Sequence, residues 1–326
     1  MKIIILTLLI FVLFVQSSKA DIPVTVTNPF NTTPNLAAGY SSLALALSDL
    51  NLVSAMTGQV TQTLAGGNSE SAPVTGFTIE SASLNAVLNS VNTVTINTSG
   101  GTVTLNAGSG GTGTPGTAVQ DGILILAGAD WITIDGLTLV DGNTSNPETM
   151  EFGIGLFKAG VSDGCQKNTI KNCSVTLNRI NNATDTVPAT DGSRGINMVN
   201  STATAQTSVL NVTSSGGSNS YNKFYPNTVQ NCNIGIALIC FEAVSPFTLA
   251  DSGNDIGGSS ASTDNSFLIF GGAPAAINVS AGIKTLAQYD NNISNNIINS
   301  NNGGGVNHPV MLMGIICGAA VSANKI

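Results

Sequence analysis

Acidic and basic side chains, the groups that could catalyse cleavage of a polymer, are scarce in this chain of 326 residues. It has 10 Lys+Arg, 18 Asp+Glu and a single histidine, His308. Glycoside hydrolysis requires two carboxyl groups about 5 to 9.5 Å apart, and no two acids are adjacent in the sequence. Lyase chemistry requires a Lys or Arg next to a substrate carboxylate, usually with Ca²⁺ bound. The sequence shows no cluster typical of either reaction.

Polar side chains recur at outward positions of segments that align with one another. These residues are Thr133 and Asp135, Thr169 and Lys171, and Thr228 and Gln230. Parallel strands stack about 4.8 Å apart, so neighbouring members of such a column could reach one sugar. We interpret the column as a candidate saccharide-binding surface. The alternative is a solvated polar face, in which Asp135 and Lys171 form no more than an exposed ion pair.

Oxygen-bearing side chains at alternate positions form a weaker candidate site for Ca²⁺. Asp141, Asn143 and Ser145 occupy the first, third and fifth places of an EF-hand-like loop, and Glu151 follows them. The loop departs from that pattern because Phe152 stands at the twelfth place, where a bidentate Glu is needed. A simple surface turn is the alternative, and we expect that no cofactor is required.

Four segments that align residue by residue would position these side chains. They are 132–139, 168–175, 227–234 and 291–298. Each has a Gly or Asn at the same place, namely Gly136, Asn172, Asn231 and Asn295. Because Gly and Asn tolerate positive φ, this column predicts a left-handed bend between two strands. We also expect the Asn side chains of the column to stack in a hydrogen-bonded ladder.

A second recurrent phrase supplies another strand in each repeat. It occurs at 153–156, 195–198, 235–238 and 314–317, and begins with Gly each time. Short strands, a recurring bend and loops of unequal length predict an all-β parallel β-helix, or solenoid. In such a fold each coil buries its apolar side against its neighbours. A β-sandwich is the alternative.

The N-terminal residues predict export. Residues 1–20 have the features of a signal peptide, and we expect cleavage after Ala20. Residues 21–52 form an N-terminal lead with a capping helix over 40–51, the only helix that we predict, capped by Ser41 or Ser42. Residues 53–326 form the β-helix.

Removal of the signal peptide leaves 8 basic and 18 acidic residues, a net charge of −10. This charge argues against a nucleic-acid partner. We expect no transmembrane segment after cleavage, and a monomer that is secreted or held at the cell surface.

Five cysteines stand at 165, 173, 232, 240 and 317. An odd number in a chain of this length does not form a disulfide framework. We predict that Cys173 and Cys232 are buried, unpaired thiols that pack as small apolar side chains.

The 132–139 segment, the Asn-x-(Ile/Val)-x-Asn phrase and the 40–51 helix resemble exported right-handed parallel β-helix proteins of the Bacteroidetes, within the wider pectin-lyase-like group. The resemblance covers about residues 40–326 and implies a right-handed β-helix, often exported by type IX secretion. It does not fix the activity, because this fold hosts lyases, hydrolases and adhesins. We expect a non-catalytic protein that contacts extracellular polysaccharides, surface glycans or other extracellular partners through its polar strand face. The alternative is a polysaccharide lyase or glycoside hydrolase with an atypical site.

The last residues, 321–326, repeat the opening of the recurrent phrase. We therefore expect a new strand to begin there, and the natural chain to continue with further coils and a sorting domain.

Overall fold

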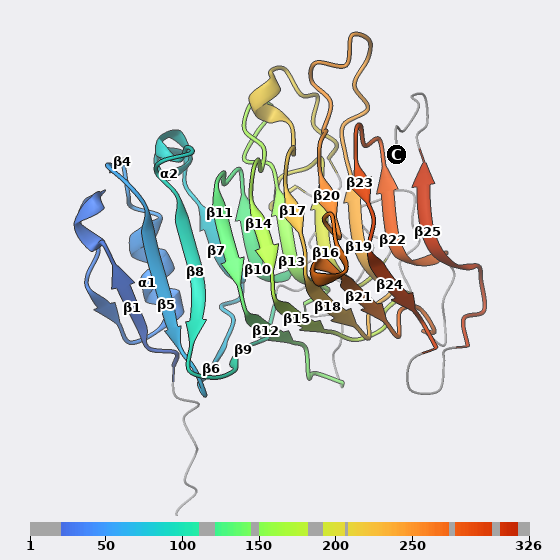
Figure 1. Ribbon diagram of the computed structural model, residues 1–326, viewed down its shortest axis with the longest axis horizontal. Coiled ribbons are helices and arrows are strands. Elements are labelled where there is room, and N and C mark those ends of the chain that lie inside the picture. The colour runs from blue at the N-terminus through green and yellow to red at the C-terminus, as the bar shows by residue number, and fades with distance from the viewer. Residues whose placement is uncertain are drawn as a thin grey trace, which may run out of the picture.

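The computed structural model describes residues 21–110, 121–144, 150–181, 192–205, 208–273, 278–301 and 307–318. In these ranges the chain forms a parallel β-helix with three long sheets, and the strands of each sheet stack along the long axis of the molecule (Figure 1). The predictions for residues 1–20, for Ser145 and for 321–326 lie outside the described residues.

The first sheet has nine strands. In spatial order they are β3 (Gly39–Tyr40), β1 (Val24–Thr27), β5 (Val60–Ala65), β8 (Val94–Ser99), β11 (Ile132–Asp135), β14 (Thr169–Lys171), β17 (Lys223–Phe224), β20 (Asp255–Ile256) and β23 (Asn292–Ile293). Strand β1 is antiparallel to both of its neighbours. From β5 onward every pair is parallel.

The second and third sheets have seven strands each. The second contains β6 (Ser69–Ser71), β9 (Val103–Asn106), β12 (Leu137–Val140), β15 (Cys173–Thr176), β18 (Asn227–Gln230), β21 (Asn265–Leu268) and β24 (Asn296–Asn299). The third contains β7 (Phe77–Glu80), β10 (Gly122–Ala127), β13 (Phe152–Phe157), β16 (Arg194–Val199), β19 (Ile234–Ile239), β22 (Ser280–Leu286) and β25 (Leu312–Gly318). A small antiparallel pair joins β2 (Thr32–Thr33) to β4 (Ala55–Met56).

The core consists of apolar columns that run through successive coils. Ile134 of β11 pairs with Ile170 of β14, which pairs with Phe224 of β17. All three side chains are buried. The phrase that begins with Gly forms the matching column of the third sheet, where Ile154 pairs with Ile196. The parallel β-helix prediction is therefore confirmed, and the β-sandwich alternative is wrong.

Helix α1 (Leu43–Leu50) covers the N-terminal end of the solenoid (Figure 1). The side chain of Ser42 accepts a hydrogen bond from the Leu45 N–H, which confirms the predicted cap. The buried carboxylate of Glu70 also accepts the N–H groups of Leu43 and Ala44, at 2.8 and 3.1 Å. A negative charge at this end of a helix is favourable because the free N–H groups point toward it.

The prediction of a single helix is wrong. Helix α2 (Ala82–Val87) and three 3-10 turns are also present: η1 (Pro29–Asn31), η2 (Ser215–Gly217) and η3 (Ala261–Thr263). In α2 the only buried residue is Leu84, and the Ser81 side chain caps its N–H. A six-residue helix with one buried residue shows no apolar period, so the sequence pattern could not reveal it. No helix within the described ranges has the length and apolar content needed to cross a membrane.

The predicted left-handed bends are present. Gly136, Asn172, Asn231 and Asn295 have φ of 81°, 54°, 55° and 51°. Asn231 does not share the column, however, because it follows β18 at the corner between the second and third sheets. Their side chains do not form the expected ladder, because those of Asn172, Asn231 and Asn295 point to separate acceptors.

Ladders form instead from Asn side chains that bond to their equivalents in the next coil, one at the corner before the first sheet and one directly after the bend, where Asn227 pairs with Cys173. One ladder contains Asn168, Asn222 and Asn254, and the other contains Asn227, Asn265 and Asn296. At these corners each amide also satisfies main-chain groups of neighbouring coils, which the exposed bends do not require.

All five cysteines are free thiols, and the four at 165, 173, 232 and 240 are buried. The predicted burial of Cys173 and Cys232 is confirmed. Cys173 lies in the column of Leu137, as expected, because Ser174 pairs with Thr138. Cys232 does not lie there and instead fills the corner between β18 and β19.

Candidate functional site

One corner of the solenoid carries an unusual series of side chains. One or two positions before each strand of the first sheet from β11 onward, one residue has positive φ. These residues are Trp131 (55°), Lys167 (57°), Tyr221 (61°), Gly253 (67°) and Asp290 (49°). We call this series the corner column. Positive φ favours Gly and Asn and costs a larger residue about 1–2 kcal/mol. The first three members therefore hold bulky or charged side chains against a local backbone preference.

The backbone of the corner column is fixed by bonds between coils. The N–H of Trp131 donates to Gln166 O at 3.1 Å, that of Lys167 to Ser220 O at 2.9 Å, and that of Tyr221 to Ser252 O at 2.9 Å. Lys167, Tyr221 and Gly253 each precede a member of the first Asn ladder, and Trp131 precedes Ile132, whose N–H donates to Asn168. The ladder thus fixes the inner side of the corner while the column residue projects outward.

A groove of about 510 Å³ follows this corner across the outer face of the first sheet. It is lined by Gln59, Thr93, Thr95, Trp131, Thr133, Lys167, Thr169, Tyr221 and Lys223. The ammonium of Lys167 lies 4.8 Å from the centre of the Trp131 ring, a cation–π contact. Tyr221 is 53% exposed. The groove thus offers aromatic faces, hydroxyl groups and two ammonium groups to one ligand.

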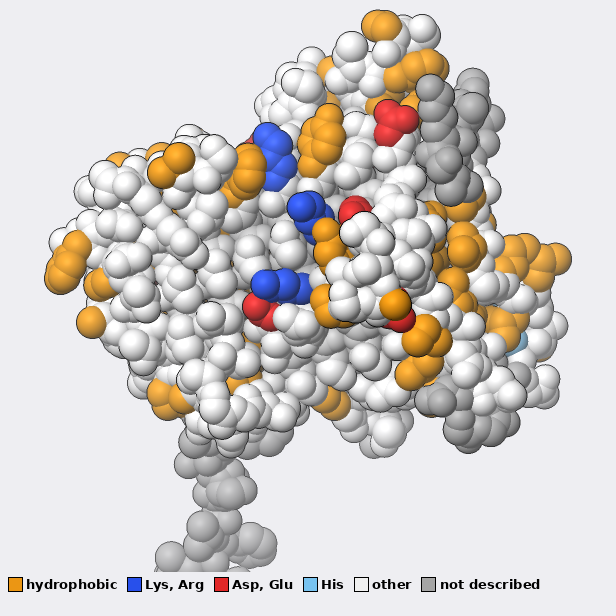
Figure 2. Space-filling model, in the orientation of Figure 1, with side chains coloured by type: hydrophobic (Ala, Val, Ile, Leu, Met, Phe, Trp, Pro, Cys, Tyr) orange, Lys and Arg blue, Asp and Glu red, His pale blue; other side chains and the backbone are white. Residues whose placement is uncertain are grey.

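The groove is positively charged although the protein is acidic. Both charged side chains that line it are lysines, Lys167 and Lys223. Figure 2 views this face and shows Lys and Arg side chains near its middle, with apolar side chains and some Asp or Glu side chains beside them. Such a local field attracts anions even when the net charge is negative.

The predicted polar column is brought together only in part. Thr133 pairs with Thr169, and both line the groove. Asp135 pairs with Lys171 at the far end of the same strands, and their charged groups lie 3.2 Å apart with side chains 28% and 38% exposed. These two residues thus form the exposed ion pair that we considered as the alternative.

Thr228 and Gln230 do not belong to that column. They lie on β18 in the second sheet, where Thr228 pairs with Ser174 and Gln230 with Thr176. The equivalent of Thr169 is Lys223. The misalignment arose because Asn168 and Asn227 both begin ladder corners, so the sequence around them is similar although the corners differ.

The candidate Ca²⁺ residues have other partners. Asp141 is buried, and its carboxylate accepts the Asn143 N–H at 2.9 Å and the Asn178 side-chain amide at 2.6 Å. Glu151 accepts the N–H of Asp121 at 3.1 Å. Across the described ranges, no three His, Cys, Asp or Glu side chains gather as a metal site.

One carboxyl group next to the corner column has a perturbed pKa. Burial raises the pKa of Asp130 to about 7; the N–H of Gln166 opposes this shift, and the charge of Asp163 adds to it. The Gln166 N–H donates to Asp130 Oδ1 at 2.7 Å. Burial also raises the pKa of Asp163. Neither side chain lines the groove.

Comparison of the chain with protein-family models, with curated proteins and with solved structures gave no match.

Proposed function

We propose that this chain is an exported protein, secreted or held at the cell surface, that binds an acidic polysaccharide along the groove without cleaving it. The observation that carries the proposal is the corner column, in which Trp131, Lys167 and Tyr221 line the groove from strained backbone. Strain of this kind persists where the side chain has a role that the backbone preference opposes. We also propose the placement among exported right-handed β-helix proteins of the Bacteroidetes.

The chemistry of the groove favours a sugar polymer that carries negative charge. Aromatic rings such as Trp131 and Tyr221 pack against the apolar faces of sugar rings, and threonine hydroxyls exchange hydrogen bonds with sugar hydroxyls. Lys167 and Lys223 supply ammonium groups for carboxylate or sulfate groups. Because the coils repeat at the strand spacing, an extended chain contacts several of them.

Glycine substitutions separate binding from folding. Trp131→Gly and Tyr221→Gly remove the aromatic rings and relieve backbone strain, so we expect unchanged or higher stability with at least tenfold weaker binding to polygalacturonate. Ile269→Gly is the matched control, because Ile269 also has positive φ (50°) but does not line the groove. Isothermal titration with polygalacturonate, and with a neutral glucan, measures the affinities. Equal affinity of the two glycine variants and the control would contradict the proposal.

Catalysis is the alternative, and Asp130 supports it, because a carboxyl with pKa near 7 is suited to act as an acid. Its carboxylate is bonded to Gln166 and does not line the groove, which is why we favour binding. Assays of the mature protein for reducing ends and for unsaturated products, with Asp130→Asn as the comparison, measure any cleavage. Turnover that Asp130→Asn abolishes would establish the enzyme instead.

Export is tested independently by N-terminal sequencing of protein recovered from the medium or the cell surface. We expect the mature chain to begin at Asp21.

A further inference from the structure

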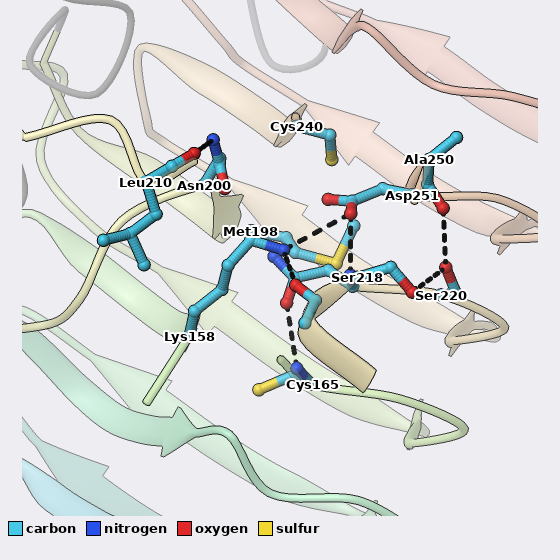
Figure 3. Close-up of polar contacts among 12 residues, drawn as sticks. Lys158, Cys165, Met198, Asn200, Leu210, Ser218, Ser220, Cys240, Ala250 and Asp251 are labelled. Carbon is cyan, nitrogen blue, oxygen red and sulfur yellow. Dashed lines mark hydrogen bonds and ion pairs between the residues drawn. The ribbon is translucent and has the colours of Figure 1, made fainter. Parts of the chain in front are cut away.

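A fully buried ion pair lies beneath the loops above the first sheet (Figure 3). Lys158 directly follows β13, and Asp251 lies in the loop between β19 and β20. Both side chains have no exposed surface, and Lys158 Nζ lies 3.3 Å from Asp251 Oδ1. Removing two charges from water costs several kcal/mol for each ion, which the attraction within the pair recovers only when every polar atom has a partner.

The hydrogen bonds around this pair are incomplete for two ions. An ammonium has three donors, and Lys158 Nζ has two acceptors among the described residues, Gly217 O at 2.5 Å and Asp251 Oδ1. Asp251 Oδ1 also accepts the Asn219 N–H at 2.9 Å. Asp251 Oδ2 is buried and has no N–H or O–H donor among the described residues; the neighbouring group is the buried Cys240 thiol, a weak donor whose pKa is raised by burial and by the Asp251 charge.

The same surroundings satisfy a secondary amide completely. An amide between Lys158 Nζ and Asp251 Cγ has one N–H and one carbonyl oxygen. The N–H would keep the bond to Gly217 O, and the carbonyl, derived from Oδ1, would keep the bond from the Asn219 N–H. Oδ2, which has no N–H or O–H donor among the described residues, is the atom that departs. We propose that Lys158 and Asp251 condense to an intramolecular isopeptide bond in the folded protein.

The reaction is a balanced loss of water. The ammonium of Lys158 first gives one proton to the carboxylate, leaving an amine and a carboxylic acid. The Nζ lone pair attacks Cγ, and the Asn219 N–H stabilises the charge that develops on Oδ1. The C–Oδ2 bond then breaks, and Oδ2 leaves as water with the carboxyl proton and one proton from nitrogen. No oxidant or other reactant is needed.

The short distance between the two groups and their complete burial favour this condensation. Because Cγ is one bond from Oδ1, Nζ lies within about 4.5 Å of it, and a shift of about 1 Å would bring the two atoms to the 3–3.5 Å at which bound groups react. The product removes both buried charges, and hydrolysis requires water to enter a site that has no exposed surface. The bond would join residues 93 positions apart and fasten the Asp251 loop to the third sheet.

An internal control is provided by the pair of Lys171 and Asp135. Their charged groups are 3.2 Å apart, almost the same separation, but both side chains are partly exposed. Water solvates these ions and opposes condensation, so we expect this second pair to stay unlinked.

The test is the mass of the purified full chain, measured after denaturation and reduction. We expect a mass about 18 Da below that of the recovered sequence, one water lost. Peptide mapping should show the Lys158 and Asp251 peptides joined, with no tryptic cleavage after Lys158 and normal cleavage after Lys171. Asp251→Ala should restore the full mass.

A full mass for the wild-type chain, with cleavage after Lys158, would overturn the proposal without any variant being needed. A loss of water located elsewhere, with Lys158 and Asp251 peptides separate, would overturn it equally. Binding of polysaccharide by the groove is independent of both results.

Discussion

Replacement of Asn222 by Ala tests how much the first Asn ladder contributes to stability. Asn222 is fully buried, and its Oδ1 accepts from the Asn168 N–H at 3.1 Å. Its Nδ2 donates to Cys165 O at 2.9 Å and to Asn254 Oδ1 at 3.1 Å. Asn254 Oδ1 keeps a second donor, the Asn222 N–H, in the variant. The substitution therefore leaves one buried N–H and one buried C=O without partners.

Each buried group left without a partner costs about 1–3 kcal/mol. We therefore expect Asn222→Ala to lower the free energy of unfolding by about 2–6 kcal/mol. Urea denaturation followed by circular dichroism measures this change, and hydrogen exchange at the Asn168 amide reports the local opening.

Asn172→Gly is the matched control, because Asn172 is an exposed asparagine of the preceding coil with φ of 54°, where Gly fits without strain. We expect its stability to stay within about 1 kcal/mol of the wild type. If Asn222→Ala cost no more than Asn172→Gly, or left the Asn168 amide equally protected, the ladder would not have the stabilising role assigned to it.

Three other perturbations have defined outcomes. Gly195→Ala places a Cβ against the Val229 side chain and the Gly235 carbonyl, so it should lower stability by about 1–3 kcal/mol in a melting experiment, whereas Gly142→Ala, which meets nothing within 4 Å, should not. The pKa of Asp130 rises from 3.8 in the unfolded chain to about 7 in the folded protein, so the folded state binds the proton more tightly. The contribution of protonated Asp130 to the free energy of unfolding is therefore complete below about pH 4 and is lost as the pH rises toward 7. Asp130→Asn keeps an acceptor for the Gln166 N–H. Its free energy of unfolding should therefore rise relative to that of the wild type by up to about 4 kcal/mol between pH 4 and 8, and a constant difference across that range would contradict the cause assigned to the pKa shift. Burial raises the pKa of Cys173 and of Cys232 to about 12, so a thiol reagent at pH 8 should label exposed Cys317 in the native protein and the four buried thiols only after denaturation; rapid labelling of Cys173 would show that the core opens.

The sequence predicted most of what depends on local periodicity. The repeated segments 132–139 and 168–175 located β11, β12, β14 and β15, and the Gly and Asn bends follow from a backbone preference of single residues. The register of 227–234 was wrong because two different corners of the coil use the same Asn chemistry, and only pairing with the neighbouring coil separates them.

Local preference revealed the bends, but it concealed the groove. Trp131, Lys167 and Tyr221 occupy positions where local preference calls for Gly or Asn, so propensity directs attention away from them. The one signal available was their place next to a ladder asparagine, as in Lys167 before Asn168 and Tyr221 before Asn222. The pairing of Lys158 with Asp251 depends on the paths of long loops, which no pattern in the sequence encodes.

The corner column has a consequence for how this surface can evolve. Its residues project from backbone that is held by the ladder and by bonds between coils, and their side chains take no part in the apolar columns of the core. Under the proposed function, a mutation at one of these positions exchanges one contact with the ligand and leaves the neighbouring coils unchanged. Substitutions at single positions of the corner column could therefore change the ligand preference one coil at a time, while the β-helix that carries these side chains stays the same.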